Sequence, residues 1–417
     1  MKRIIVCLVL LLAISLAFCD LRLVGTSITF LQGDLGKGYP RLAEVLAILA
    51  SVVFFLISFT KKTCSEKIRI GRDLFLLCGL IMFGFALFKP FFLNYLRSVC
   101  LIPTLFFISV INLDISDKLL GLLFKIIYSI ISISAIFVII SPFIDLGVST
   151  FYIDEFDSTA QRYIGYGSSL PYQACFNLLA IPLFFYLQRK DKSKLWNYLQ
   201  ISMLVLNVAA IVLTGARTAY LIAIVLFLFY SKSWRKNLNI NSAILIVLIA
   251  GVAIYYVGDI LSSILNYRHG VDLSHRDEVW LIGIKLVLTN PILGIQNFFE
   301  DGKQFGQIVA HVQCGYFEIL FWGGFLALTL YLSSFAMFYS VLKPHKDLKV
   351  CFIGTMLVFL IFMITEILIY SVQDYYLLLL IIGLLLANYQ TKMRHYTLAL
   401  KTYEEYYICR RAWKPNV

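Results

Sequence analysis

Arg217 is a cation inside an otherwise apolar stretch that reads IVLTGARTAYLIAIVLFLFY from Ile211 to Tyr230. A charged side chain at the centre of a bilayer costs roughly 2.5–3.5 kcal/mol, so the depth of Arg217 decides what it can do. Thr214 and Gly215 predict a tight turn just before it, because glycine supplies backbone freedom. Arg217 then lies in the first turn of a helix, where N–H groups and the positive dipole end add to its charge. This arrangement predicts a site for an anion such as a phosphate; an arginine that reaches to lipid headgroups is the alternative.

A second arginine, Arg276, lies in the segment LSHRDEVWLIGIKLVLTNPILGIQNFFE. Ser274 followed by Asp277 fits a capping box, which predicts that a helix starts here with Arg276 in its first turn. Asn290 and Pro291 end that helix. We predict a helix at the outer membrane interface with an arginine at its positive end; a plain amphipathic surface helix is the alternative. Its predicted apolar face consists of Val279, Trp280, Gly283, Leu286 and Val287.

The composition is that of a membrane protein. Sixty per cent of the 417 residues are hydrophobic, 14% are charged and the mean hydropathy is +0.84. Soluble domains have about 45–50% apolar and about 25% charged residues. The net charge of +12 does not indicate nucleic-acid binding, because Lys and Arg lie in short loops between apolar runs. Nine cysteines without a C-x-x-C pair predict neither a disulfide framework nor a zinc site.

Twelve apolar segments predict an all-α, polytopic integral membrane protein, with residues 1–417 forming a single transmembrane domain. Most are long enough to cross a bilayer as a helix of roughly 17–25 residues, and we expect the first to be uncleaved. The segments are 4–18, 42–59, 73–88, 98–112, 119–141, 172–187, 195–213, 217–230, 240–257, 313–341, 350–368 and 375–390.

The loops between these segments alternate in charge. Lys and Arg are roughly four times denser in one set of loops, which predicts that this set and both termini are cytoplasmic. Two outer loops are long, 142–171 and 258–312, and loops of more than about 12–15 residues are usually functional or disordered. Both contain aromatic residues, glycines and prolines rather than a low-complexity tract, so we expect the chemistry on the outer face, with part of the site in 258–312. Arg162 is the only basic residue of the first outer loop.

Four motifs follow one another along the chain. They are R-x-x-G-x-G at Arg162, T-G-A-R-T-A around Arg217, R-x-x-x-W followed by N-P-I-L-G-I from Arg276, and His311 before E-I-L-x-x-G-G. In this order they resemble the O-antigen polymerase and O-antigen ligase superfamily. Each motif is degenerate, so the resemblance depends on their order and spacing. It covers roughly residues 140–341, and the twelve-span topology extends it over the whole chain.

The resemblance implies glycan transfer from undecaprenyl diphosphate on the outer, periplasmic face of the bacterial inner membrane. In that family, arginines of the outer loops hold the diphosphate, which Arg217 and Arg276 match. A histidine activates the acceptor hydroxyl, which His311 matches. The chemistry is consistent, because arginine forks stabilise charge on a leaving phosphate and a neutral imidazole accepts a proton near pH 7.

The histidine segment departs from the family pattern. Val312 stands where an asparagine is usual, and His311 lies a residue or two early. Glu278 and Glu300 are therefore alternative bases. The residues that we expect to act in catalysis are His311, Arg217 and Arg276, and those that we expect to bind substrate are Arg162, Arg217, Arg276, Trp280 and Glu278.

Several functions are compatible with these features. A polymerase moves the growing glycan onto another lipid-linked repeat unit, whereas a ligase moves it onto lipid A-core. The divergent histidine segment favours a polymerase. We then expect membrane lipid around the protein and a polysaccharide chain-length regulator as a partner. Neither a cofactor nor a metal is expected, since the lipid diphosphate supplies the driving force and no D-x-D motif occurs. A secondary transporter would carry charges near the midplane in both halves, whereas these arginines gather outside in one half. We expect Glu366 and Asp374 near the outer end of the bundle. A scaffold without catalysis leaves the arginines unexplained.

Arg217→Ala should abolish transfer without unfolding the protein, because the leaving diphosphate loses its cationic ligand. Arg217→Lys should also lose much of the activity, since a point charge does not replace a bidentate fork. Turnover of the purified variants in lipid, compared at equal amounts of folded protein, measures both effects. Normal activity in well-expressed Arg217→Ala would contradict an anion site at this helix start.

Overall fold

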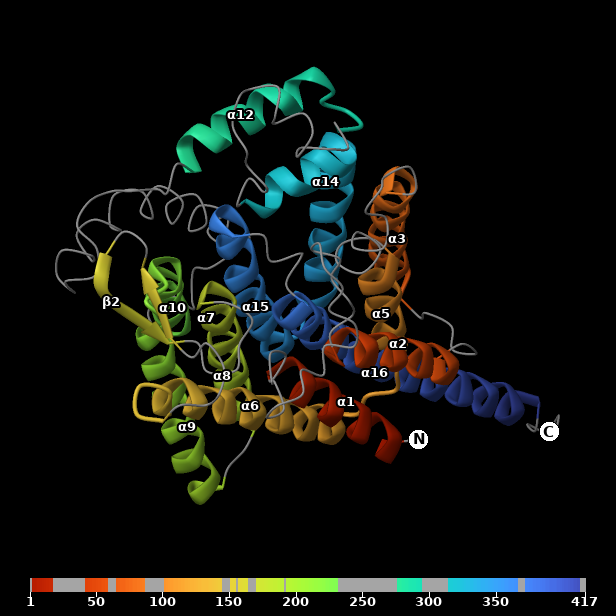
Figure 1. Cartoon of the computed structure of the whole chain (residues 1–417). Coiled ribbons are helices and arrows are strands. Elements are labelled where there is room, and N and C mark those ends of the chain that lie inside the picture. Colours follow the sequence, from red (N-terminus) through yellow and green to blue (C-terminus); the bar gives the residue numbers. More distant parts are fainter. Residues whose placement is uncertain are drawn as a thin grey trace.

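The chain folds into a bundle of helices with one small hairpin of strands (Figure 1). The computed structural model describes residues 2–17, 42–58, 65–86, 101–144, 151–154, 157–163, 170–190, 193–231, 276–294, 314–366 and 372–412. Its elements are α1 (Lys2–Ala17), α2 (Leu42–Ser58), α3 (Glu66–Ala86), α5 (Leu101–Ile111), α6 (Asp117–Ile140), β1 (Phe151–Asp154), β2 (Asp157–Tyr163), α7 (Leu170–Leu178), α8 (Ala180–Lys190), α9 (Lys194–Thr214), α10 (Arg217–Tyr230), α12 (Arg276–Thr289), α14 (Gly315–Leu342), α15 (Lys346–Thr365) and α16 (Val372–Ala412).

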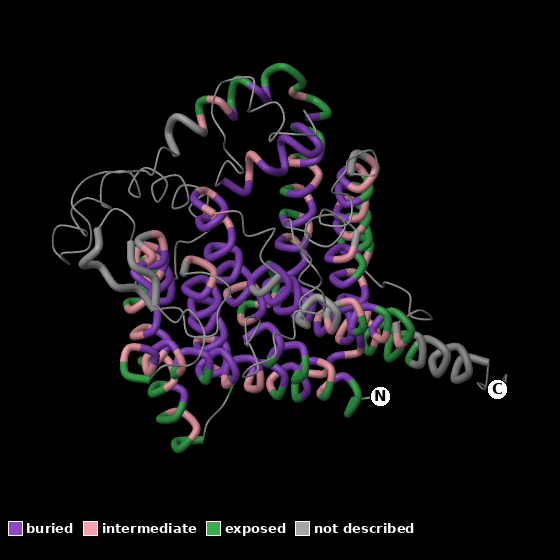
Figure 2. The backbone as a smooth tube through the Cα atoms, viewed as in Figure 1, coloured by how far each residue is buried: buried purple, intermediate pink, exposed green. Residues whose placement is uncertain are grey.

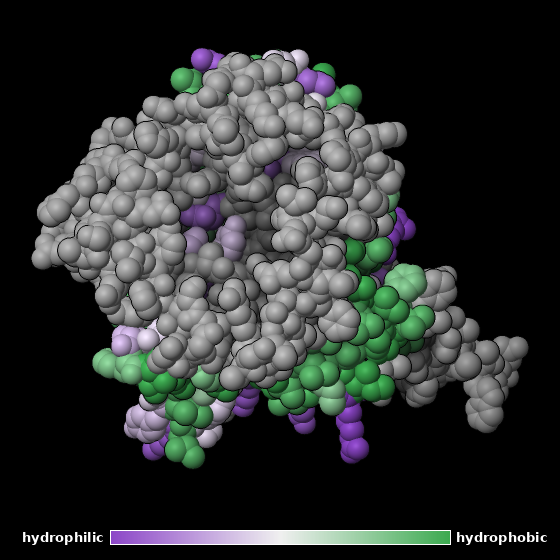
Figure 3. Space-filling view, in the orientation of Figure 1, coloured by the Kyte–Doolittle hydropathy of each residue, from purple (hydrophilic) through white to green (hydrophobic). Residues whose placement is uncertain are grey.

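The described helices are those of a membrane protein. Five of them are long and apolar enough to cross a bilayer: α6, α9, α14, α15 and Asp374–Leu400 of α16. Large apolar side chains face outward, and Figure 3 shows hydrophobic residues along the lower edge of the molecule. Leu56 is 68% exposed and Val205 is 62% exposed, which suits a surface covered by lipid rather than water. The complete set of twelve spans stays a prediction, and the segment 240–257 lies outside the described residues.

The predicted span 172–187 consists of two helices, α7 and α8, with a turn at Leu179 between them. Pro182 explains the break, because its ring displaces the carbonyl of residue 178 and it has no N–H for the helical ladder. The last helix is longer than predicted. It continues from the span 375–390 through the basic tail as far as Ala412, and its end projects from the bundle (Figure 1).

One pair of strands adds to the predicted all-α fold. β1 and β2 lie in the first outer loop and pair antiparallel, with Tyr152 opposite Arg162 and Ile153 opposite Gln161. Aromatic and β-branched residues favour extended backbone, which is consistent with the sequence FYID of β1. The hairpin was not predicted from the sequence, because this loop contains no long alternating pattern.

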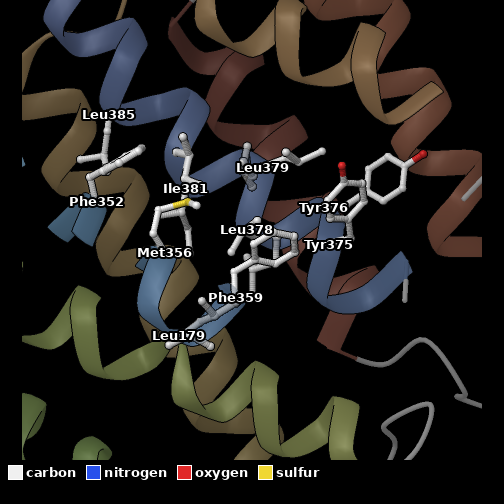
Figure 4. Packing of buried hydrophobic residues seen from close by; sticks show 14 of the residues in the cluster. Leu179, Phe352, Met356, Phe359, Tyr375, Tyr376, Leu378, Leu379, Ile381 and Leu385 are labelled. Carbon is white, nitrogen blue, oxygen red and sulfur yellow. The ribbon is translucent and has the colours of Figure 1, made fainter. Parts of the chain in front are cut away.

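The centre of the hydrophobic core is formed by α15 and the first part of α16, which the other helices surround. Helix α15 and residues 374–391 of α16 are buried on nearly all sides, as the purple tube in Figure 2 shows. In Figure 4 the side chains of Phe352, Met356 and Phe359 on α15 pack against those of α16, and Phe359 stacks on Tyr375 with ring centroids 6.0 Å apart. These two helices are therefore the support against which the more peripheral ones are placed.

Loops predicted to be cytoplasmic converge at one end of the bundle. The ammonium group of Lys392 lies 2.8 Å from a carboxylate oxygen of Asp117, and that of Lys190 lies 2.8 Å from one of Asp347. The amide of Asn388 donates to the carbonyl oxygen of Ile115 at 2.9 Å. These contacts join the loop before α6, the end of α8, the start of α15 and the tail of α16. They are consistent with the predicted alternation of the loops, while the orientation of the termini stays a prediction.

The predicted span 313–341 is not one straight helix. Helix α14 extends from Gly315 to Leu342 but consists of two helices, because Gly324 has φ 61° and ψ −165° and breaks it into two parts. Figure 1 shows α14 changing direction just below α12. The first part, 315–323, therefore runs across the end of the bundle, and the second part, from Phe325, runs along α3. Hydropathy alone did not reveal this break, because both parts are apolar.

Asp114→Ala should lower the free energy of unfolding by about 1–3 kcal/mol, because it removes the carboxylate that hydrogen-bonds Arg394. The side chain of Arg394 is only 16% exposed, so water replaces this partner poorly. Unfolding in mixed micelles measures the change. The matched control is Glu66→Ala, whose partner Arg69 lies 3.7 Å away with side chains 76% and 58% exposed. That pair should contribute less than about 0.5 kcal/mol, and equal losses at both sites would contradict the argument.

Candidate active site at the outer end of the bundle

Arg217 is the first residue of α10, as the sequence predicts. Helix α9 ends at Thr214, Gly215 takes the left-handed conformation with φ 63°, and Ala216 is the extended N-cap of α10. Alanine offers no side-chain oxygen to the first N–H groups of the helix, and no acidic residue stands in its first turn. The positive end of the dipole of α10 therefore has no local compensation from these positions, which favours an anion there.

The start of α10 meets the end of α15 and the start of α14. The hydroxyl groups of Thr218 and Thr365 lie 3.0 Å apart. Glu366 caps the C-terminus of α15, and its carbonyl oxygen accepts a hydrogen bond from the N–H of Gly315 at 3.2 Å. The contact of Thr218 with Thr365 and the hydrogen bond of Gly315 to Glu366 thus connect the start of α10 to the start of α14 through the end of α15. His311 lies four residues before Gly315, outside the described residues.

Two further helices pack together here. Helix α7 contacts both α16 and α10, and Asp374 lies near the start of α16. Asp374 is 1% exposed, whereas Glu366 is partly exposed. Glu366, which ends α15, and Asp374 lie away from the charged pairs of Asp347 and Lys392, and that this end of the bundle is the outer one stays a prediction. Figure 3 shows hydrophilic residues at the centre of the face that is in view, above the hydrophobic lower edge.

Helix α12 is fixed to the break in α14 by its C-terminal end. The N–H of Phe325 donates to the carbonyl oxygen of Pro291 at 2.8 Å, and the N–H of Leu326 donates to that of Ile292 at 3.3 Å. These bonds join the motif N-P-I-L-G-I directly to the motif that ends in G-G. Figure 1 shows α12 lying over the first part of α14. The second arginine, Arg276, is at the opposite end of α12.

The predicted apolar face of α12 faces the bundle. Gly283, Leu286 and Val287 are buried, and Trp280 is partly buried and packs against the hydrophobic core. The opposite side is largely apolar, because Leu281, Ile284 and Leu288 are exposed there together with Lys285. A helix with apolar residues on both sides is better suited to an apolar environment than to a wet surface, and its place at the membrane interface stays a prediction.

The structure places the predicted site residues to different extents. Arg217 and Arg276 begin α10 and α12, Arg162 lies on β2, which packs against α9, and Glu278 lies on α12. Of the side chains of the predicted substrate-binding residues, the structure describes that of Trp280. Its partial burial against the core shows a structural contact, and its substrate contact stays a prediction. The roles of Arg162, Arg217, Arg276, Glu278, Glu300 and His311 likewise stay predictions.

The two threonines that join α10 to α15 were not among the predicted site residues. Thr218 stands inside the motif T-G-A-R-T-A, directly after Arg217, which was the available signal. Thr365 precedes Glu366, a charged residue at the end of an apolar run. Within the described ranges, no three His, Cys, Asp or Glu side chains are grouped so that they could hold a metal ion. The independence of the reaction from metal stays a prediction.

The region that contains this site matches a known family. Residues 202–332 match the family described as O-antigen ligase. The predicted resemblance to the O-antigen polymerase and ligase superfamily is confirmed over these residues. The match runs from α9 into α14, so it includes the turn before Arg217, α12 and the break at Gly324. It supports a membrane protein that processes glycans as a ligase or polymerase does. A search among curated proteins gives no significant match.

A cysteine pair tests the contact between α10 and α15. In a variant whose native cysteines are replaced, Thr218→Cys with Thr365→Cys should form a disulfide on mild oxidation, because the two hydroxyl groups lie 3.0 Å apart. Protease cleavage in the loop between them, followed by non-reducing electrophoresis, shows the cross-link. Thr218→Cys with Thr355→Cys is the control, since Thr355 lies ten residues earlier in α15, roughly 15 Å along the helix. Equal cross-linking in both pairs would contradict the placement.

Proposed function

We propose that this protein transfers an oligosaccharide from an undecaprenyl-diphosphate donor to an acceptor glycan, and that it acts as a polymerase of lipid-linked repeat units. The observation that carries the proposal is the junction of α10, α14 and α15 beside Arg217. Helix α10 and the start of α14 lie in the region that matches the O-antigen ligase family. The start of α10 offers backbone N–H groups, a positive dipole end and an arginine to an anion. A lipid diphosphate has the charge and the depth in the membrane that such a site requires.

The proposed reaction is one direct displacement. An acceptor hydroxyl attacks the anomeric carbon of the donor sugar, the bond from that carbon to the diphosphate oxygen breaks, and the electron pair leaves with the diphosphate. The proton of the hydroxyl passes to a base, which we assign to His311, with Glu278 and Glu300 as the alternatives. Arg217 and Arg276 stabilise the charge that develops on the leaving oxygen. A single displacement inverts the anomeric centre.

The setting of the reaction follows from the same proposal. The donor is a membrane lipid, so the site lies at the outer face of a bacterial inner membrane, with both termini in the cytoplasm. Neither a cofactor nor a metal takes part, because cleavage of the diphosphate linkage drives the transfer. For a polymerase, a polysaccharide chain-length regulator is the expected protein partner.

A ligase is the second candidate function. The matched family is described as O-antigen ligase, which favours transfer to lipid A-core. The departure of the histidine segment, with Val312 after His311, favours a polymerase. The donor site is the same in both, because the two activities differ in the acceptor.

Purified protein in lipid vesicles should convert undecaprenyl-diphosphate-linked repeat units into a ladder of longer lipid-linked glycans. Lipid A-core is offered in a separate reaction, and the products are separated by size. A ladder without lipid A-core supports the polymerase, and transfer only to lipid A-core supports the ligase. Flux of substrate across the vesicle membrane without any transfer would mean that the protein is a transporter.

A further inference from the structure

The break in α14 creates a need for hydrogen-bond acceptors. A helix that starts again at Phe325 presents N–H groups in its first turn that its own backbone does not satisfy. In an apolar environment such groups are costly unless another segment supplies acceptors. Pro291 and Ile292 supply two of them, at 2.8 and 3.3 Å. The segment after α12 is therefore an N-terminal cap for the second part of α14.

Two glycines make this cap possible, and each one fits the backbone of the other segment. Gly324 combines φ 61° with an extended ψ, a conformation that is nearly exclusive to glycine, and a methyl group on it would overlap the carbonyl group of Ile292. Gly294 has φ 80°, and a methyl group on it would lie 2.7 Å from the carbonyl oxygen of Leu320 and 2.9 Å from the amide nitrogen of Gly324. In both cases the methyl group would meet backbone atoms, which cannot move away by a change of rotamer as a side chain can.

The cap also sets the direction of α12. Among the contacts of α12 with other described elements, those with α14 are the principal ones, and Leu286 and Val287 in its C-terminal half are buried. Arg276 is at the other end of this 14-residue helix, about 20 Å away. A rotation of about 5° at the cap would therefore move the start of α12 by about 2 Å. Misplacement of a catalytic group by about 1 Å can lower the reaction rate about a hundredfold.

We propose that Gly294, Gly324 and the two backbone hydrogen bonds from Phe325 and Leu326 to the segment after α12 position Arg276 for the leaving diphosphate. We call this arrangement the lock. These glycines are positioning residues, because they act through α12 and do not touch substrate. The proposal deepens the proposed function and depends on the role of Arg276 in it. If the glycines served folding alone, disturbing the lock would lower stability and would not act through Arg276.

Phe325→Pro is the sharpest disturbance of the lock. Proline removes the N–H that bonds to Pro291 and points a ring carbon at that carbonyl oxygen, too close for van der Waals contact, so the cap must shift. Proline is otherwise well tolerated at the first position of a helix, and the extended ψ of Gly324 suits a residue that precedes proline. Phe325→Ala is the matched control, since it removes the same side chain, which is 50% exposed, and keeps the N–H. Gly324→Ala is a second disturbance.

The first measurement is turnover of the lipid-diphosphate donor in vesicles, in a double-mutant cycle with Arg276→Ala. Phe325→Pro should lower kcat about tenfold or more relative to Phe325→Ala, with a smaller change in KM, because Arg276 acts on charge that develops in the transition state. In the Arg276→Ala background, the same change should cost less than about twofold, since the residue that the lock positions is absent. Gly84→Ala and Gly121→Ala are further controls; nothing lies within 4 Å of a methyl group at either glycine, so both should keep full turnover.

The second measurement reports the position of α12 without any reaction. Spin labels at Leu281 on α12 and at Ile133 on α6, both exposed, give a distance distribution in a cysteine-depleted protein. Phe325→Pro should shift or broaden this distribution, and Phe325→Ala should leave it unchanged. This readout needs only folded protein in lipid, and Gly324→Ala replaces Phe325→Pro where the latter does not fold.

Two outcomes would overturn the lock. An unchanged distance distribution in folded Phe325→Pro and Gly324→Ala would show that the cap does not position α12. A shifted distribution with a fully additive loss of turnover in the cycle would show that the lock does not act through Arg276. Failure of the proposed function is distinguishable, because Arg276→Ala would then keep full donor turnover, or no donor would react, while the labels still report whether α12 moves.

Discussion

The outer half of this fold depends on the requirement that every backbone N–H in an apolar environment has an acceptor. In an unbroken α14 every backbone N–H beyond the first turn would find its acceptor within the helix, and α14 would be one straight helix. Because it breaks at Gly324, the segment from Pro291 to Gly294 has to approach closely enough to accept from the new helix start. Proline contributes to this, since it ends α12 without adding an N–H of its own. The motifs N-P-I-L-G-I and E-I-L-x-x-G-G therefore meet in one backbone junction, in which the first supplies the acceptors and the second contains the break.

The same break brings distant parts of the chain to one place. With α14 turned at Gly324, residues 315–323 run across the end of the bundle until the N–H of Gly315 reaches the carbonyl oxygen of Glu366. Glu366 follows Thr365, whose hydroxyl group contacts that of Thr218 beside Arg217. A straight helix would have carried the start of α14 away from α10. The charged pairs at the opposite end of the bundle join α8 to α15 and α16 to α6.

The sequence was informative where a local signal determines the backbone. Thr214 and Gly215 predict the turn before Arg217, and the spacing of apolar residues predicts which face of α12 is buried, because both depend on neighbours in the chain. The break in α14 was not predictable in this way. Glycine pairs also occur inside continuous helices, and the positive φ of Gly324 is stabilised by a segment about thirty residues earlier. The contact between Thr218 and Thr365 likewise joins residues 147 positions apart.

The two arginines of the proposed diphosphate site are held in physically different ways. Helix α10 runs antiparallel to α15 and is fixed near both ends, by Thr218 to Thr365 and by the hydroxyl of Tyr230, which donates to the carbonyl oxygen of Val350 at 3.2 Å. Helix α12 is held by backbone hydrogen bonds just after its C-terminal end and by apolar side chains, Trp280 among them, that pack against the core. Apolar packing is less directional than a hydrogen bond, so a change at the junction still alters the direction of α12 and with it the position of its start. The precision of Arg217 thus comes from side-chain contacts along α10, and that of Arg276 depends on the fit of two glycines.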